Sequence, residues 1–154
     1  MSLPYRQIHL DFHTSPYICD VGKDFDRDQW VKTLVDAHVN HINLFAKDHH
    51  GYFFYPSVCG PMHPGLFDKT LSLLDEQVSA CKEHGISVGI YTCVAWNEYA
   101  ANCHPEWQQV DMQGVLGANP PFAADYYKWQ NLCLNHPDYL ALIKRELAEE
   151  ADKN

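Results

Sequence analysis

Three short segments of the chain alternate between apolar residues and residues that are polar, small or aromatic, which is the pattern of a half-buried β-strand. These segments are residues 7–12, 41–47 and 86–93. Their apolar faces carry Ile8, Leu10 and Phe12, then Ile42, Leu44 and Ala46, then Ile86, Val88 and Ile90. Their other faces carry His9 and Asp11, then Asn43, Phe45 and Lys47, then Ser87, Gly89, Tyr91 and Cys93. The alternation predicts three strands, each with one face in a hydrophobic core.

Apolar residues at helical spacing follow these segments. The best-marked helix covers residues 27–39, where Asp26 fits the N-cap position. A second helix is expected over residues 66–84, and a third is expected to begin near Pro137, because proline suits the first turn of a helix. Residues 94–135 show no such pattern and are expected to form a loop, and loops of this length are usually functional.

The order of these elements, βαβαβ–loop–α, implies parallel strands, because helical crossovers connect strands of the same direction. A doubly wound sheet has helices on both faces, and its strands tend to be apolar throughout. Here each strand has one polar or small face, which favours the inner wall of a (β/α)8 TIM barrel near its strand ends. We therefore expect an α/β fold in which residues 1–154 form the first three β/α units of a partial barrel that lacks the later strands. A small self-contained sheet is the alternative.

Polar groups crowd the end of the second predicted strand. The run Lys47-Asp48-His49-His50-Gly51-Tyr52 places a cation, an acid, two imidazoles, a glycine and an aromatic ring directly after apolar residues. Ligands of α/β proteins usually bind at the carboxyl ends of the strands. A solvated loop would explain a single histidine, but four ionisable groups in a row favour a binding site. We therefore take Lys47, His49, His50 and Tyr52 as candidate substrate-binding residues.

The composition is that of a single globular domain, with 46% hydrophobic and 20% charged residues among 154. A net charge of −9 argues against nucleic acid and anionic membranes as partners. No apolar run approaches the roughly 18–20 residues of a membrane helix, and the first residues lack the apolar core of a signal peptide. The six cysteines are widely spaced without Cys-x-x-Cys pairs, so we expect reduced thiols. A cytoplasmic protein without cofactor or metal is the simplest interpretation.

Several spaced motifs resemble the N-terminal part of α-L-fucosidase-like glycoside hydrolases. They are Phe-Asp-x-x-x-Trp at 25–30, the strand end Ala-Lys-x-His-x-Gly-Tyr at 46–52 and the strand Gly-Ile-x-Val-Gly-Ile-Tyr at 85–91. A related group of glycosyl hydrolases is more similar still, through motifs at 9–15, 21–26, 47–52, 104–107 and 110–114. The resemblance covers nearly the whole chain and implies an enzyme that hydrolyses O-glycosyl bonds in a catalytic barrel.

Two features separate this sequence from the fucosidase motif. Asp48 and His50 stand where the fucosidases have a histidine and an acid, so the resemblance does not carry fucose specificity. In the fucosidases the nucleophilic aspartate lies at the end of the fourth barrel strand, whereas this sequence ends after its third expected helix. We therefore expect a piece of a longer enzyme or a divergent half-barrel.

The resemblance also gives the residues after the first and third strands a role in sugar binding. His13 and Trp96 are candidate substrate contacts, with the indole as a stacking platform. Glycoside hydrolysis normally uses two carboxylates about 5–10 Å apart. Asp11 and Glu98 each follow a separate strand end in aromatic company. We take both as substrate contacts first and as catalytic candidates second.

The leading hypothesis is a glycoside hydrolase in which this chain is the sugar-binding N-terminal half of the barrel, inactive until the remaining strands are present. Its expected partners are a carbohydrate substrate and either a second copy or the rest of a longer polypeptide, because open strand edges pair readily. A metal-dependent amidohydrolase is an alternative suggested by Asp11-Phe12-His13, although Ser15 stands where a second histidine is needed. A non-catalytic carbohydrate-binding or interaction module is the third.

Overall fold

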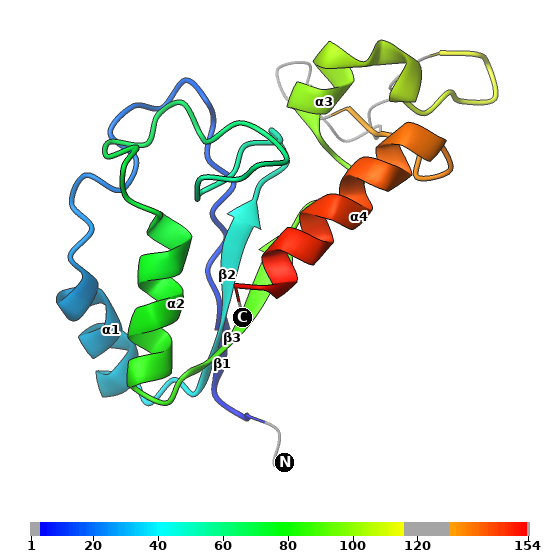
Figure 1. The fold of residues 1–154 in the computed structure, drawn as a ribbon. Helices are drawn as coiled ribbons and strands as arrows, with labels where there is room; N and C mark the ends of the chain where they lie inside the picture. The colour runs from blue at the N-terminus through cyan, green and yellow to red at the C-terminus, as the bar shows by residue number, and fades with distance from the viewer. Residues whose placement is uncertain (1–3, 116–129, 154) are drawn as a thin grey trace.

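The computed structural model describes residues 4–115 and 130–153 (Figure 1). Its three parallel strands lie in the order β1 (Gln7–His9), β2 (His41–Lys47) and β3 (Ser87–Thr92). Helices α1 (Arg27–Asp36) and α2 (Leu73–Glu83) lie together on one side of this open sheet. Helix α3 (Glu98–Cys103), the 3-10 helix η1 (Pro105–Trp107) and helix α4 (Pro137–Ala151) follow β3. The prediction of an α/β fold with three successive parallel β/α units of a partial barrel is confirmed.

The apolar faces of the strands form the main core together with α1 and α2. Ile8, Ile42, Leu44, Ala46, Val88 and Ile90 pack in one cluster with Val31, Leu34, Leu74 and Val78. The opposite face carries rings from all three strands. The centroid of the Phe45 ring lies 4.2 Å from that of Tyr91 and 5.4 Å from that of His9. The predicted contrast between an apolar face and a polar or aromatic face is therefore confirmed within the strands, with Lys47 at the end of β2 as the exception.

The first strand is shorter than predicted, because it ends at His9 and not at residue 12. Beyond His9 the chain leaves β2, and the Asp11 carboxylate accepts a hydrogen bond from the backbone N–H of His13 at 3.0 Å. This local turn ends the alternation. Leu10 is consequently 47% exposed, and Phe12 packs with the rings of the opposite face.

The helices also differ from their predicted bounds. Helix α1 stops at Asp36, because His38 adopts a left-handed φ of 56° that an α-helix cannot continue. Helix α2 starts at Leu73 and not at residue 66, because the Ser72 side chain caps it by accepting a backbone N–H of its first turn. Residues 98–107 were expected to be loop but form α3 and η1. A second hydrophobic cluster, including Ala101, Trp107, Leu132, Tyr139 and Ile143, fastens them to α4.

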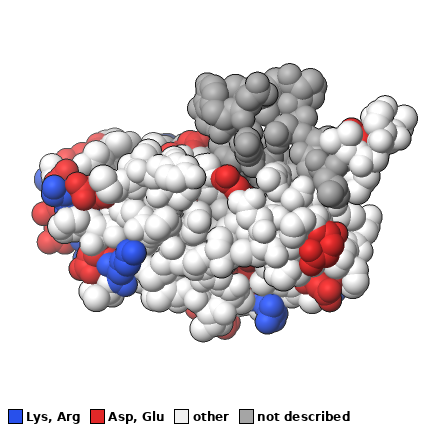
Figure 2. Space-filling model, turned by 90° about the horizontal axis from the view of Figure 1, so that it is seen from above, with Lys and Arg blue, Asp and Glu red and all other residues white. Residues whose placement is uncertain are grey.

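The surface at the carboxyl ends of the strands agrees with the acidic composition. Seen from this end, Lys and Arg side chains appear as separate spots and form no continuous basic patch on the described residues (Figure 2). In the same ranges, none of the helices is both long enough and apolar enough to cross a membrane.

Candidate functional site

A β-bulge at the end of β2 decides which way the strand-end residues point. Two steps along β2, from Phe45 to Lys47, match a single step along β3. The bulge turns the Lys47 side chain away from the aromatic face on which the alternation predicts it, so that part of the prediction is wrong. Lys47 is fully buried and ion-paired with Glu146 of α4, and its ammonium lies 5.6 Å from the centre of the Phe53 ring.

The buried Asp48 carboxylate shapes the strand-end loop, residues 48–53, which follows β2. Its Oδ1 accepts hydrogen bonds from the backbone N–H groups of His50 (3.0 Å) and Tyr52 (3.3 Å), and burial raises its pKa. Gly51 turns the chain with a φ of 85°, and a Cβ atom there would lie 2.0 Å from the Oδ1 of Asn97. Both the backbone conformation and the available space therefore require glycine at this position.

The strand-end cluster consists of His13, His49, Cys93 and Trp96, which follow or end the three strands. The imidazole rings of His13 and His49 stack with their centroids 3.5 Å apart, and the indole of Trp96 meets His49 edge-on at 4.6 Å. The backbone N–H of His49 donates to the Nδ1 of His13 at 3.2 Å. The Nδ1 of His49 lies 2.9 Å from the Sγ of Cys93. The fold thus brings three of the predicted substrate-binding residues into contact.

Burial keeps the rings of this cluster uncharged near pH 7. It lowers the pKa of His49 to about 4, with a further contribution from the charge of His13. The pKa of His13 is also lowered, mainly by burial, although the nearby Asp11 opposes the shift. Because the Nδ1 of His13 accepts a backbone N–H, the neutral ring carries its proton on Nε2, which lies 3.4 Å from the Tyr91 hydroxyl oxygen. The cluster therefore offers both hydrogen-bond donors and acceptors.

The two candidate catalytic carboxylates are each paired with a different histidine. Asp11 is exposed, and its nearer oxygen lies 4.0 Å from the Nε2 of His13. Glu98 belongs to the first turn of α3, and its Oε2 lies 2.6 Å from the Nδ1 of His50. A backbone hydrogen bond of 3.1 Å from Glu98 to the His49 carbonyl holds α3 against the strand-end loop. The predicted residues His50 and Glu98 therefore form a pair beside the strand-end cluster.

Two predicted site residues lie apart from this cluster. Lys47 points toward α4, as described above, and the Tyr52 ring lies 5.6 Å from the ring of Tyr99, between centroids. Two residues of this region, Cys93 and Asp48, were not among the predicted site residues. Cys93 was already placed on the inner face of its strand by the alternation, which was a usable signal. For Asp48 the signal in the sequence was weaker: an aspartate shortly before a glycine is typical of a tight turn.

The Asp11–His13 segment, which suggested the amidohydrolase alternative, does not confirm it. Both the Nδ1 of His13 and one carboxylate oxygen of Asp11 accept backbone N–H groups. Among residues 4–115 and 130–153, no group of three or more His, Cys, Asp or Glu side chains is placed to hold a metal ion.

Comparisons with known proteins identify the kind of protein to which these residues belong. A family model described as "Hypothetical glycosyl hydrolase 6" matches residues 26–153. Among solved structures, α-L-fucosidase isoenzyme 2 from Paenibacillus thiaminolyticus is 37% identical, with a TM-score of 0.80, over 92% of this chain and 20% of its own. The comparison with curated proteins gave no match.

Two further α-L-fucosidases share the fold at low identity. The enzyme from Bacteroides thetaiotaomicron is 18% identical with a TM-score of 0.58, over 87% of this chain and 25% of its own. The enzyme from Thermotoga maritima is 13% identical with a TM-score of 0.58, over 84% of this chain and 26% of its own. The chain thus spans only 20% to 26% of the length of these three structures.

The lowered pKa of His49 predicts a specific loss of stability in acid. In the unfolded chain this histidine takes up a proton near pH 6.5, whereas in the folded protein it does so only near pH 4. Between these values the unfolded state binds more protons, so the free energy of unfolding falls as the pH falls, by about 2 kcal/mol from pH 7 to pH 4.5 for this residue. Urea unfolding of His49→Gln should therefore show a correspondingly smaller acid-induced loss than the parent protein.

The control for this measurement is His84→Gln at the end of α2, which should keep the full acid-induced loss. The same loss in His49→Gln as in the parent would show that His49 is not held neutral by burial.

Proposed function

The chain belongs to the hypothetical glycosyl hydrolase 6 family, and we propose that it forms the sugar-binding N-terminal part of a fucosidase-like glycoside hydrolase barrel. The single observation that carries this proposal is the 37% identity with the Paenibacillus α-L-fucosidase. Because the chain spans 20% of that structure, hydrolysis is proposed to need further barrel strands.

The strand-end cluster has the chemistry to bind an uncharged sugar. A neutral imidazole donates from one nitrogen and accepts at the other, which matches a hydroxyl group that can do both. The indole of Trp96 supplies an aromatic surface for the C–H groups of a sugar ring. We place one sugar ring against His13, His49 and Trp96, with its hydroxyl groups toward the imidazoles.

The carboxylates are assigned to the same ring as hydrogen-bond acceptors. Glu98 is 30% exposed while it is paired with His50, and Asp11 is 72% exposed beside His13, so ligand hydroxyls can reach both. Glycoside hydrolysis needs a second carboxylate about 5–10 Å away from the first. We propose that Asp11 or Glu98 transfers protons only together with a carboxylate from a later strand. Lys47 is assigned a positioning role through Glu146, because its ammonium is buried away from this surface.

This assignment predicts weak sugar binding without turnover. We expect the 154-residue chain to bind L-fucose or D-galactose in the millimolar range and to leave their 4-nitrophenyl α-glycosides uncleaved. His49→Ala should weaken binding about five- to thirtyfold, because one or two neutral hydrogen bonds of about 1 kcal/mol each are lost. The measurement is an NMR titration that follows the indole N–H signals, with thermal unfolding of each variant in parallel.

The matched control is His84→Ala, which should leave the affinity unchanged. A lower melting temperature of His49→Ala with unaltered sugar binding would make His49 a structural residue. Turnover that Asp11→Asn or Glu98→Gln abolishes would show instead that the chain already contains a complete catalytic centre.

The outer strands of the sheet supply the argument for a partner. Within the described residues β1 and β3 each pair on one side only, and the rings of His9, Phe45 and Tyr91 occupy the inner face. In a closed barrel such edges pair with later strands, and inner side chains pack in layers. We propose that this face is covered by further strands of a longer polypeptide or by a second copy of the chain.

The 154-residue chain alone is therefore expected to self-associate. Sedimentation velocity over a concentration series should show a weight-average mass that rises as the protein concentration rises to tens of micromolar, because open edges pair between chains. A sharp monomer over the whole series, with cooperative unfolding, would contradict this proposal and favour a self-contained sheet.

A further inference from the structure

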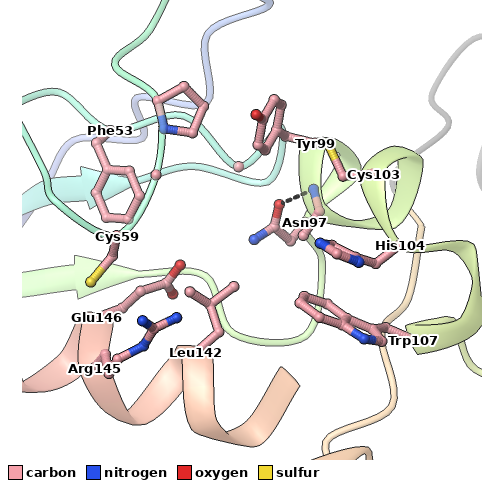
Figure 3. Close-up of a pocket in the computed structure, with 14 residues that line it drawn as sticks. Phe53, Cys59, Asn97, Tyr99, Cys103, His104, Trp107, Leu142, Arg145 and Glu146 are labelled. Carbon is pink, nitrogen blue, oxygen red and sulfur yellow. Dashed lines mark hydrogen bonds between the residues drawn. The ribbon is translucent and has the colours of Figure 1, made fainter. Parts of the chain in front are cut away.

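A cavity of about 250 Å³ lies on the other side of the strand-end loop, between residues 51–61, α3, η1 and α4 (Figure 3). None of the strand-end cluster residues, nor His50 or Glu98, lines it. The loop thus borders two separate places: His49 and His50 contact the cluster and Glu98, while Gly51 and Phe53 line the cavity.

Aromatic rings form much of the cavity wall. Trp107 is 8% exposed and stacks on His104, with ring centroids 3.8 Å apart and an angle of 9° between the planes. Phe53 and Tyr99 line the cavity from the strand-end loop and from α3. Such a wall suits a ligand that carries a flat or apolar ring.

A cation, Arg145, lines the cavity from α4. Arg145 is exposed on α4, and within residues 4–115 and 130–153 its guanidinium makes no ion pair or hydrogen bond. Two acids stand nearby on the same helix, but both are engaged. Glu146 is paired with the buried Lys47, and Glu149 accepts hydrogen bonds from the hydroxyl of Ser57 (2.8 Å) and the backbone N–H of Val58 (3.1 Å).

Lys47 balances the charge of Glu146, whereas the hydrogen bonds of Glu149 go to neutral groups of Ser57 and Val58, so Arg145 and Glu149 together leave this side of α4 near neutral. Burial and the nearby Glu149 and Glu146 raise the pKa of Cys59 in the lining, and the charge of Arg145 acts against this shift. A guanidinium can donate two parallel hydrogen bonds to a carboxylate. Figure 3 shows Arg145 beside Leu142 and Glu146, on the α4 side of the cavity.

We propose that this cavity is a second binding site, distinct from the strand-end cluster, for a small carboxylate that carries a ring. The carboxylate pairs with the guanidinium of Arg145, and the ring lies against the aromatic wall that includes Phe53 and Trp107. A sugar acid and an aromatic acid share this chemistry, and the two are separated by the choice of probe.

Isothermal titration of the 154-residue chain tests the proposal with two matched pairs of probes. Benzoate is compared with uncharged benzamide, and D-glucuronate with D-glucose. We expect saturable binding of at least one acid and at least about tenfold weaker binding of its uncharged analogue, because the charge-assisted hydrogen bonds are lost. Preference for benzoate identifies an aromatic acid as the ligand class, and preference for glucuronate identifies a sugar acid.

Arg145→Gln and Lys144→Gln change the net charge equally, but only Arg145 lines the cavity. Arg145→Gln should weaken binding of the acid at least about tenfold, while Lys144→Gln changes it less than about twofold. Both positions are exposed, so circular dichroism should show an unchanged fold. Equal effects of the two variants, equal affinity for acid and uncharged analogue, or absence of saturable binding would overturn the proposal.

Discussion

A buried ion pair between Lys47 and Glu146 joins the end of β2 to α4 across 99 positions of the sequence. Lys47 is 0% and Glu146 3% exposed, so each has lost its water, and the opposite charge offsets much of that cost of several kcal/mol per ion. Burial raises the pKa of Glu146, and Lys47 acts against this shift. The bulge in β2 makes the pair possible, because it turns Lys47 toward α4 and leaves the residues after it to form the strand-end loop.

The strand-end loop serves both proposed sites because its two sides are fixed separately. On one side Asp48 gathers backbone N–H groups, and His49 stacks on His13. On the other side Gly51 lies against Asn97, whose Oδ1 accepts the Ala100 N–H at 2.9 Å and so caps α3. Helix α3 in turn supplies Glu98 to His50. The strand-end cluster and the second cavity therefore share one loop and one neighbouring helix, while the groups assigned to bind ligands differ.

The sequence allowed the sheet to be predicted because its alternation follows directly from the core: Ile42, Leu44 and Ala46 are buried as expected. The prediction was wrong where a local interaction overrides the alternation. This happens at the bulge before Lys47 and at the turn closed by Asp11. Helix α3 was missed although Asn97 followed by Glu98 is a recognisable helix start. The strand-end position of His13, His49 and Trp96 was predictable, but their stacking was not, since it depends on how three separate loops pack. The positions of residues at the strand ends indicate which of them meet. Tertiary packing alone decides which of their polar groups are paired and which are turned away.

The most direct test of this account is a double-mutant cycle on the buried pair, using Lys47→Met, Glu146→Gln and the double variant. Urea unfolding should show a loss of about 3–5 kcal/mol for each single variant, because each leaves one buried charged or polar group without its partner. The double variant should lose less than the sum of the two, with a coupling energy of about 0.5–3 kcal/mol. Additive losses, or single variants as stable as the parent, would contradict the claim that this pair holds the strand-end loop and α4 together.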